Sequence, residues 1–169
     1  GVCFDAPGGT FRNEQFTEYK ANRQEQPEEI TESIPIILDL LKAFNIEALI
    51  LPGYEADDIA GTIAKKASEA EFLTYLLTTD KDYAQLVDEN TFLYKPKFLG
   101  KGYDVMGIPE ILEKWEIERV EQVIDILGLQ GDAVDNIPGI PKVGKKTAIK
   151  LLKEYGSVEE IVANGKNIK

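Results

Sequence analysis

Acidic residues that could bind a ligand or take part in catalysis follow directly after short apolar runs in this sequence. Asp5 follows the run Val2–Phe4, and Asp80 follows the run Thr74–Thr78. Runs of this length predict strands, and the carboxyl ends of parallel strands meet at one edge of a sheet, where ligands bind. We therefore expect a group of acids to gather at that edge: Asp5, Glu55, Asp57, Asp58, Asp80 and Asp82.

Clustered carboxylates of this kind predict a site for divalent metal ions. Ionised carboxylates that are held close together repel one another, and a bound cation offsets that repulsion. Oxygen ligands without histidine or cysteine select Mg²⁺ or Mn²⁺. Asp132 and Asp135 lie three residues apart in a predicted turn and could face the same ion. Together these acids favour hydrolysis of a phosphodiester with two metal ions, a chemistry that phosphatases and nucleases share.

Helix capping is the simpler role for each acid. An acid just after a strand commonly accepts hydrogen bonds from the first turn of the next helix and is favoured by the helix dipole. Capping accounts for any one of these positions taken alone. Acids after three successive strands, with Glu55, Asp57 and Asp58 in one group, favour a metal site over capping alone.

Composition excludes several other chemistries. The 169 residues include no histidine and one cysteine, Cys3, which excludes histidine-assisted nucleophiles, Cys/His zinc sites and disulfides within the chain. A hydrophobic content of 43% is ordinary for a chain with a core. No apolar run approaches the roughly 20 residues of a membrane span. The net charge of −11 does not exclude a nucleic-acid ligand, because the distribution of the basic residues matters more than their sum.

A lysine-rich turn within residues 137–152 supplies the positive charge that a nucleic-acid ligand needs. Gly139 and Gly144 allow the backbone to approach a ligand, and the amides that begin the next helix suit phosphate. The pattern resembles a helix-hairpin-helix, which holds the DNA backbone without reading bases. A solvated lysine-rich helix is the alternative. The candidate DNA-binding residues of the turn are Gly139, Lys142, Gly144, Lys145, Lys146 and Thr147.

Strands and helices that alternate along the chain must position these residues, as is typical of an α/β protein with a mostly parallel sheet. We expect residues 1–107 to form the α/β core and residues 108–169 a helical module with its hairpin at about 137–153. Apolar residues at helical spacing predict helices around Ile30–Phe44 and Ile59–Ala70. The predicted strands are Val2–Phe4, Ala48–Leu51, Thr74–Thr78 and Thr91–Tyr94, and the later helices are Ile108–Trp115, Val120–Leu127, Thr147–Tyr155 and Val158–Ala163.

Taken in order, these motifs resemble those of the 5′ nuclease domain of bacterial DNA polymerase I, within the flap endonuclease family. The resemblance covers essentially the whole chain, and the ordered set is specific although each motif alone is weak. It implies a PIN-like, resolvase-like sheet flanked by helices and followed by a helix-three-turn-helix module. It also implies truncation at both ends, because family members begin with an earlier strand that carries a metal-site aspartate and have a further C-terminal stretch that completes the α/β domain. The matching segments are residues 4–6, 10–14, 19–23, 53–58, 79–82, 131–136 and the lysine-rich turn.

The resemblance implies a role for each candidate residue. The first metal site matches Asp5, Glu55 and Asp57, with Asp58 adjacent, and the second matches Asp80, Asp82, Asp132 and Asp135. Lys20 and Arg23 match catalytic residues of an arch over about residues 10–27. Arg12, Lys20 and Arg23 are also candidate DNA-binding residues. The hairpin matches the module that holds the duplex, where the family can bind K⁺ through backbone carbonyls.

The implied activity is that of a 5′-3′ exonuclease and flap endonuclease, which hydrolyses DNA or RNA-primer phosphodiesters in primer removal and DNA repair. The implied substrate is branched or 5′-flap duplex DNA, and family members are normally fused to polymerase and proofreading domains. We expect a monomer in the bacterial cytoplasm, at the nucleoid and without a membrane. Two alternatives stay open: a non-catalytic DNA-structure-binding fragment without a complete metal site, and an α/β metal-dependent phosphatase, which would not need the lysines of residues 142–153.

Overall fold

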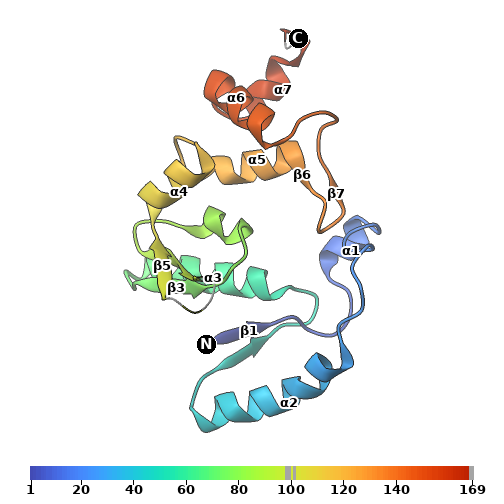
Figure 1. Cartoon of the computed structure of the whole chain (residues 1–169), viewed down its shortest axis with the longest axis vertical. Helices are drawn as coiled ribbons and strands as arrows, with labels where there is room; N and C mark the ends of the chain where they lie inside the picture. The colour runs from blue at the N-terminus through green and yellow to red at the C-terminus, as the bar shows by residue number, and fades with distance from the viewer. Residues whose placement is uncertain (98–99, 101, 168–169) are drawn as a thin grey trace. The chain divides into compact units, whose positions relative to one another are not determined.

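The computed structural model describes residues 1–97, 100 and 102–167 (Figure 1). The chain forms two compact units. The first comprises residues 1–62 and 134–137, and the second comprises the rest of the chain. The boundary falls within helix α3 (Ala56–Glu69), so this helix contributes residues to both units.

In the first unit, strands β1 (Val2–Phe4) and β2 (Ala48–Ile50) pair in parallel, with Val2 opposite Ala48. Parallel strands need a long crossover connection, and helices α1 (Phe11–Gln15) and α2 (Glu28–Ala43) lie in that connection. Both predicted strands are confirmed, although β2 ends one residue earlier than expected.

Helix α2 forms where the apolar spacing predicts a helix, and it continues through Pro35. Its predicted apolar stripe is largely exposed: Ile30, Ile37 and Phe44 are all exposed, and none of the described residues of the helix is buried. The spacing of apolar residues determines which face of a helix they share. It does not determine whether another element of the same chain covers that face.

In the second unit, β3 (Thr74–Leu77) pairs in parallel with β4 (Thr91–Pro96), and β5 (Tyr103–Met106) pairs with β4 in antiparallel fashion. Strand β5 is not predicted by the sequence patterns. Only four residues long, it depends on its ladder with β4, which places Met106 opposite Leu93.

The helices of the second unit surround its core. Helices α4 (Ile108–Trp115) and α7 (Val158–Ala163) have the predicted bounds, whereas α5 (Gln122–Gln130) and α6 (Lys145–Tyr155) both begin two residues from the predicted start. The 3₁₀ turns η1 (Asp82–Leu86) and η3 (Gly165–Asn167) and the short strands β6 (Gly131–Asp132) and β7 (Ile137–Pro138) complete the described elements. The largest fully buried hydrophobic side chains among the described residues are Ile111, Val123, Ile126 and Leu129. Within the described residues, no helix is both long and apolar enough to cross a membrane.

Candidate functional site

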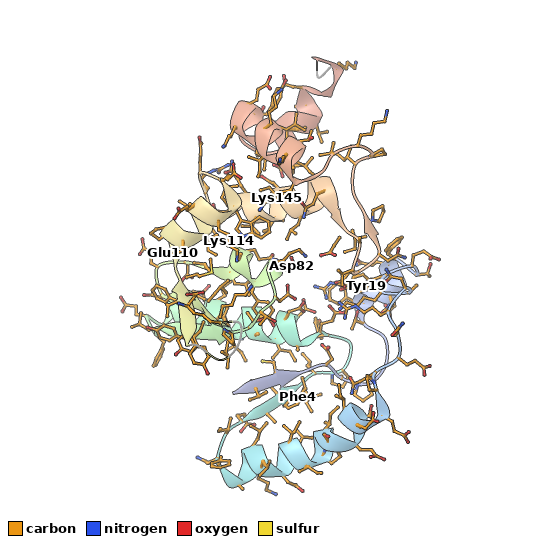
Figure 2. The ribbon with its side chains drawn as sticks, viewed as in Figure 1. Phe4, Tyr19, Asp82, Glu110, Lys114 and Lys145 are labelled. Atoms are coloured by element: carbon orange, nitrogen blue, oxygen red, sulfur yellow. The ribbon has the colours of Figure 1, made fainter. Side chains whose placement is uncertain are left out.

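Glu55 lies at the centre of the acidic group in the first unit. Its side chain is buried, with 6% of the residue exposed, directly before the first turn of α3. The hydroxyl of Tyr19 donates a hydrogen bond to Oε2 at 2.9 Å, and Nζ of Lys20 donates one to Oε1 at 2.7 Å. A buried carboxylate is tolerated because it is paired and hydrogen-bonded. Burial, and then the hydrogen bond to Glu55, raises the pKa of Tyr19, which Figure 2 labels.

Arg12 binds Asp58 through both of its terminal nitrogens. The two hydrogen bonds are each 2.7 Å long, a bidentate geometry that is among the strongest for side chains. Asp58 also accepts a hydrogen bond from the backbone N–H of Glu55 at 3.0 Å, which is a helix-capping contact. The bond from Arg12 is the main reason that the pKa of Asp58 is lowered. Asp58 therefore has the capping role that the sequence left open, and Arg12 links the segment of α1 to the start of α3.

Asp5 reaches the same helix start from the end of β1. Its Oδ1 accepts a hydrogen bond from the backbone N–H of Ala56 at 2.7 Å. On the first turn of α3, desolvation raises the pKa of Asp57, and the charges of Glu55 and Asp58 raise it further. Asp5 therefore contacts the backbone of the first turn of α3, the turn that carries Asp57 and Asp58.

Asp135 also belongs to the first unit, and basic residues of the predicted arch contact its side chain. Arg23 forms a hydrogen-bonded ion pair with its Oδ1, and Nζ of Lys20 lies 4.0 Å from its Oδ2. The backbone N–H of Lys20 donates to the carbonyl of Asp135 at 2.9 Å. Lys20 adopts a left-handed backbone conformation with φ 56°, an uncommon state for a residue with a side chain. Such a conformation persists because the contacts with Glu55 and Asp135 hold it.

In the second unit, Lys81 lies between two of the predicted acids. Its Nζ is 2.6 Å from Oδ2 of Asp132 and 3.0 Å from Oδ1 of Asp82. That Oδ1 is buried and accepts no hydrogen bond of good geometry from the described residues. Burial raises the pKa of Asp82, and the ammonium group of Lys81 partly opposes the shift. Asp80 Oδ1 accepts the backbone N–H of Asp82 at 2.9 Å, as in an Asx turn.

Basic side chains of the chain therefore form ion pairs with many of the predicted metal ligands. Across residues 1–97, 100 and 102–167, no three acidic side chains are grouped so that they could hold a metal ion. The types of ligand nevertheless fit a hard divalent cation, since they are all carboxylates. The meeting of all the predicted acids at one sheet edge stays a prediction.

The lysine-rich turn connects α5 to α6 as a hairpin. A Cβ at Gly139 would lie 2.2 Å from the carbonyl carbon and oxygen of Gln130, so only glycine fits there. The backbone N–H of Ile140 donates to the carbonyl of Leu129 at 2.8 Å, and Gly144 caps the start of α6. This geometry leaves the predicted DNA-binding side chains Lys142, Lys145, Lys146 and Thr147 exposed.

Three residues at these sites are not among the predicted ones. Tyr19 and Lys81 could have been noticed, because each is adjacent in sequence to a predicted residue in a motif that was singled out. Asn136 could have been noticed in the same way, and its side-chain amide donates to the carbonyl of Glu18 at 2.7 Å. In the sequence, the signal for all three is a side chain that can donate a hydrogen bond, next to an acidic or basic residue of a motif.

Comparison with protein families decides the relationship. Residues 1–116 match the family described as the 5′-3′ exonuclease, N-terminal resolvase-like domain, and residues 118–169 match the 5′-3′ exonuclease, C-terminal SAM fold. The chain belongs to the 5′-3′ exonuclease family. The predicted fold class, a resolvase-like α/β domain followed by a helical domain, is confirmed by these matches.

Individual relatives match nearly the whole chain. The 5′-3′ exonuclease of Aquifex aeolicus is 42% identical over 163 residues, which are 96% of this chain and 55% of that protein. DNA polymerase I of Bacillus caldotenax is 40% identical over 168 residues, which are 99% of this chain and 19% of that protein. The chain therefore spans about half of the separate exonuclease and about a fifth of the polymerase.

Solved structures of the family resemble this chain closely. The flap endonuclease of bacteriophage T5, in a complex with DNA and metal ions, has a TM-score of 0.79 at 26% identity, over 94% of this chain and 61% of that one. The T5 5′-exonuclease with bound zinc has a TM-score of 0.75 at 26% identity, over 95% of this chain and 61% of that one. Dependence on divalent metal ions is general for the nucleases of this family.

Proposed function

We propose that this chain is the nuclease part of a structure-specific 5′-3′ exonuclease and flap endonuclease. It hydrolyses phosphodiester bonds at 5′ flaps or branches of duplex DNA, or in RNA primers, with two Mg²⁺ or Mn²⁺ ions. The observation that carries the proposal is the direct contact between a basic segment and the acidic group: Lys20 on Glu55, and Arg23 on Asp135. Family membership and the T5 flap endonuclease complex support it.

The side chains divide the chemistry between them. Bound divalent ions would supply an activated water and neutralise charge in the transition state. The residues that would hold them are Asp5, Glu55, Asp57 and Asp58 for the first ion, and Asp80, Asp82, Asp132 and Asp135 for the second. Lys20 and Arg23 offer cations to the charge that develops on the phosphate during attack. Tyr19 keeps this basic segment in place through its buried hydroxyl.

The hairpin contributes affinity rather than base recognition. Exposed lysines at the start of α6 contact backbone phosphates, which bind without regard to sequence. Carbonyl oxygens of the same turn offer a site for K⁺. In the cell, we infer that the chain works in primer removal and repair, in the bacterial cytoplasm at the nucleoid, as a monomeric part of a polymerase or as a separate exonuclease.

Cleavage of a labelled 5′-flap duplex tests the proposal. The chain should cut the flap with Mg²⁺ or Mn²⁺ and not with EDTA. Asp80→Asn should lose most of this cleavage while it still binds the duplex, because it removes one anionic oxygen from the predicted metal site. Asp104→Asn is the control, since Asp104 is exposed and pairs with Lys97 at 2.9 Å.

Three outcomes separate the candidate functions. Metal-dependent cleavage that falls in Asp80→Asn and persists in Asp104→Asn supports the nuclease. Flap binding without cleavage in either metal would instead identify a non-catalytic DNA-binding fragment. Hydrolysis of a small phosphoester without flap binding would identify a phosphatase.

A further inference from the structure

Three lysines of the second unit lie close together on different elements. Lys95 is on β4, Lys114 on α4 and Lys145 at the first position of α6. Lys114 and Lys145 are labelled in Figure 2. Burial of its stem, and then the charges of Lys95 and Lys145, lowers the pKa of Lys114. The contacts agree with this: Lys145 reaches the ring of Trp115, the neighbour of Lys114 in sequence, and Lys114 reaches Met106, which lies opposite Leu93 on the strand that carries Lys95.

Packing against the core holds two of these lysines in place. Nζ of Lys145 lies over the ring of Trp115, 5.0 Å from its centroid, and Trp115 is buried. A cation over an indole face is attracted by the ring. Nζ of Lys114 lies 4.0 Å from the sulfur of Met106, another buried residue. The charges therefore project from an ordered surface rather than from free lysine chains.

One carboxylate, Asp104, lies opposite Lys95 in the strand ladder and acts on Lys114, but its ion pair is with Lys97, at 2.9 Å. Arg12, Lys20, Arg23 and Lys81 all form ion pairs with acids of the predicted metal sites. In the described part of the chain, no ion pair is found for Lys95, Lys114 or Lys145, and the last two are exposed. Lysines without an ion pair stand out in a protein with a net charge of −11, because acids are plentiful and could have paired with them.

We propose that Lys95, Lys114 and Lys145 form a phosphate-binding surface that extends the contact with duplex DNA from the hairpin onto α4 and β4. Lys145 belongs to both regions, because it begins α6 directly after the hairpin. A DNA backbone presents successive phosphates along one path, so it can satisfy several amines on adjacent elements at once. The inference rests on the proposed function and adds a contact that the hairpin motif does not contain.

The salt dependence of duplex binding tests this surface. Lys114→Gln removes one charge with little change in shape, and Lys42→Gln on α2 is the matched control, since Lys42 is also exposed. Fluorescence anisotropy would give dissociation constants for a labelled duplex between about 50 and 200 mM salt. Each lost phosphate contact lowers the slope of log K against log salt by about 1, which is a change of about three- to fourfold in affinity across that range.

The expected result is a smaller slope for Lys114→Gln and an unchanged slope for Lys42→Gln. The free energy of unfolding in urea should not fall in Lys114→Gln, because the substitution relieves repulsion. A slope equal to that of the unsubstituted chain would overturn the proposal, even where Lys145→Gln with Lys146→Gln weakens binding. In that case the hairpin, and with it the proposed function, would stand without this surface.

A calorimetric titration with inorganic phosphate, at constant ionic strength, separates DNA from a free anion as the ligand. Saturable binding of phosphate that is lost in Lys114→Gln, together with an unchanged DNA slope, would overturn the proposal in favour of a small-anion site. Failure of the unsubstituted chain to bind any duplex would overturn the proposed function as well.

Discussion

Replacement of Tyr19 by phenylalanine removes a single hydroxyl group from the contact between the basic segment and Glu55. Both residues are buried, each with 6% exposed, and the hydroxyl lies 2.9 Å from Oε2 of Glu55. A hydrogen bond to a charged group contributes about 1.5–3 kcal/mol to stability. We expect Tyr19→Phe to lower the free energy of unfolding by about 2 kcal/mol, because Glu55 stays buried with Lys20 as its remaining close donor.

Urea unfolding in the presence of EDTA measures this loss without competition from metal ions. Tyr103→Phe is the control, since Tyr103 is 51% exposed and its ring stacks on Tyr94. A loss below about 0.5 kcal/mol in Tyr19→Phe, or one no larger than in the control, would refute the reasoning.

The pH dependence of stability gives a second test of the same contact. The pKa of Tyr19 is raised in the folded chain, so the folded state favours the protonated phenol. This stability is fully present below the unfolded pKa of about 10 and is lost as the pH rises above it. The alkaline loss should be smaller in Tyr19→Phe, and an identical alkaline profile would contradict the assignment.

Three further changes test other parts of the structure. Lys81→Met removes the ammonium group between two predicted metal ligands, so calorimetry should show Mn²⁺ binding tightened by about tenfold, equivalent to ~1.4 kcal/mol, and unchanged affinity would count against the site. Gly139→Ala forces a Cβ into backbone and should cost about 1–3 kcal/mol or more of stability in urea, whereas Gly144→Ala, with open space around its Cβ, should cost less than about 0.5 kcal/mol. Equal losses of stability in the two variants would show that the hairpin does not need the close approach of Gly139 to the backbone of Gln130. Arg12→Gln should reduce the loss of stability as the pH falls below about 4, because the lowered pKa of Asp58 contributes stability above its unfolded pKa that disappears on protonation. Urea unfolding from about pH 2 to 6 measures this, and an acid limb as steep as in the unsubstituted chain would contradict it.

Local patterns predicted most of the elements. Helices α4 and α7 and strand β1 have the predicted bounds, since capping, spacing and apolar runs are properties of neighbouring residues. Strand β5 was missed because four residues carry little periodicity and its partner strand ends several residues before it. The predicted stripe of α2 has the right spacing but is not buried among the described residues, since burial depends on what packs against a helix.

In the candidate sites too, the motifs identified residues, whereas the contacts between distant residues came only from the structure. The motifs around Glu55 and Asp80 identified the acids as candidates. The hairpin glycines were predicted to let the backbone approach a ligand, whereas the structure shows that Gly139 approaches the backbone of Gln130. No pattern predicted that Arg12 would bind Asp58, 46 residues away, or that Lys81 would lie between two acids of the second unit. Lys114 gave no signal at all, because it is one lysine in an ordinary amphipathic helix.

Sequence alone therefore determined the kind of chemistry this protein can perform. With no histidine and one cysteine, its candidate ligands are carboxylates, and the ordered motifs with the lysine-rich turn indicated a 5′ nuclease. Tertiary structure decided which acid meets which cation: Glu55 with Tyr19 and Lys20, and Asp58 with Arg12. The physical reason is that residue types and local spacing are written in the chain, whereas charge interactions depend on distance through space and on burial. Only the folded chain sets those two quantities.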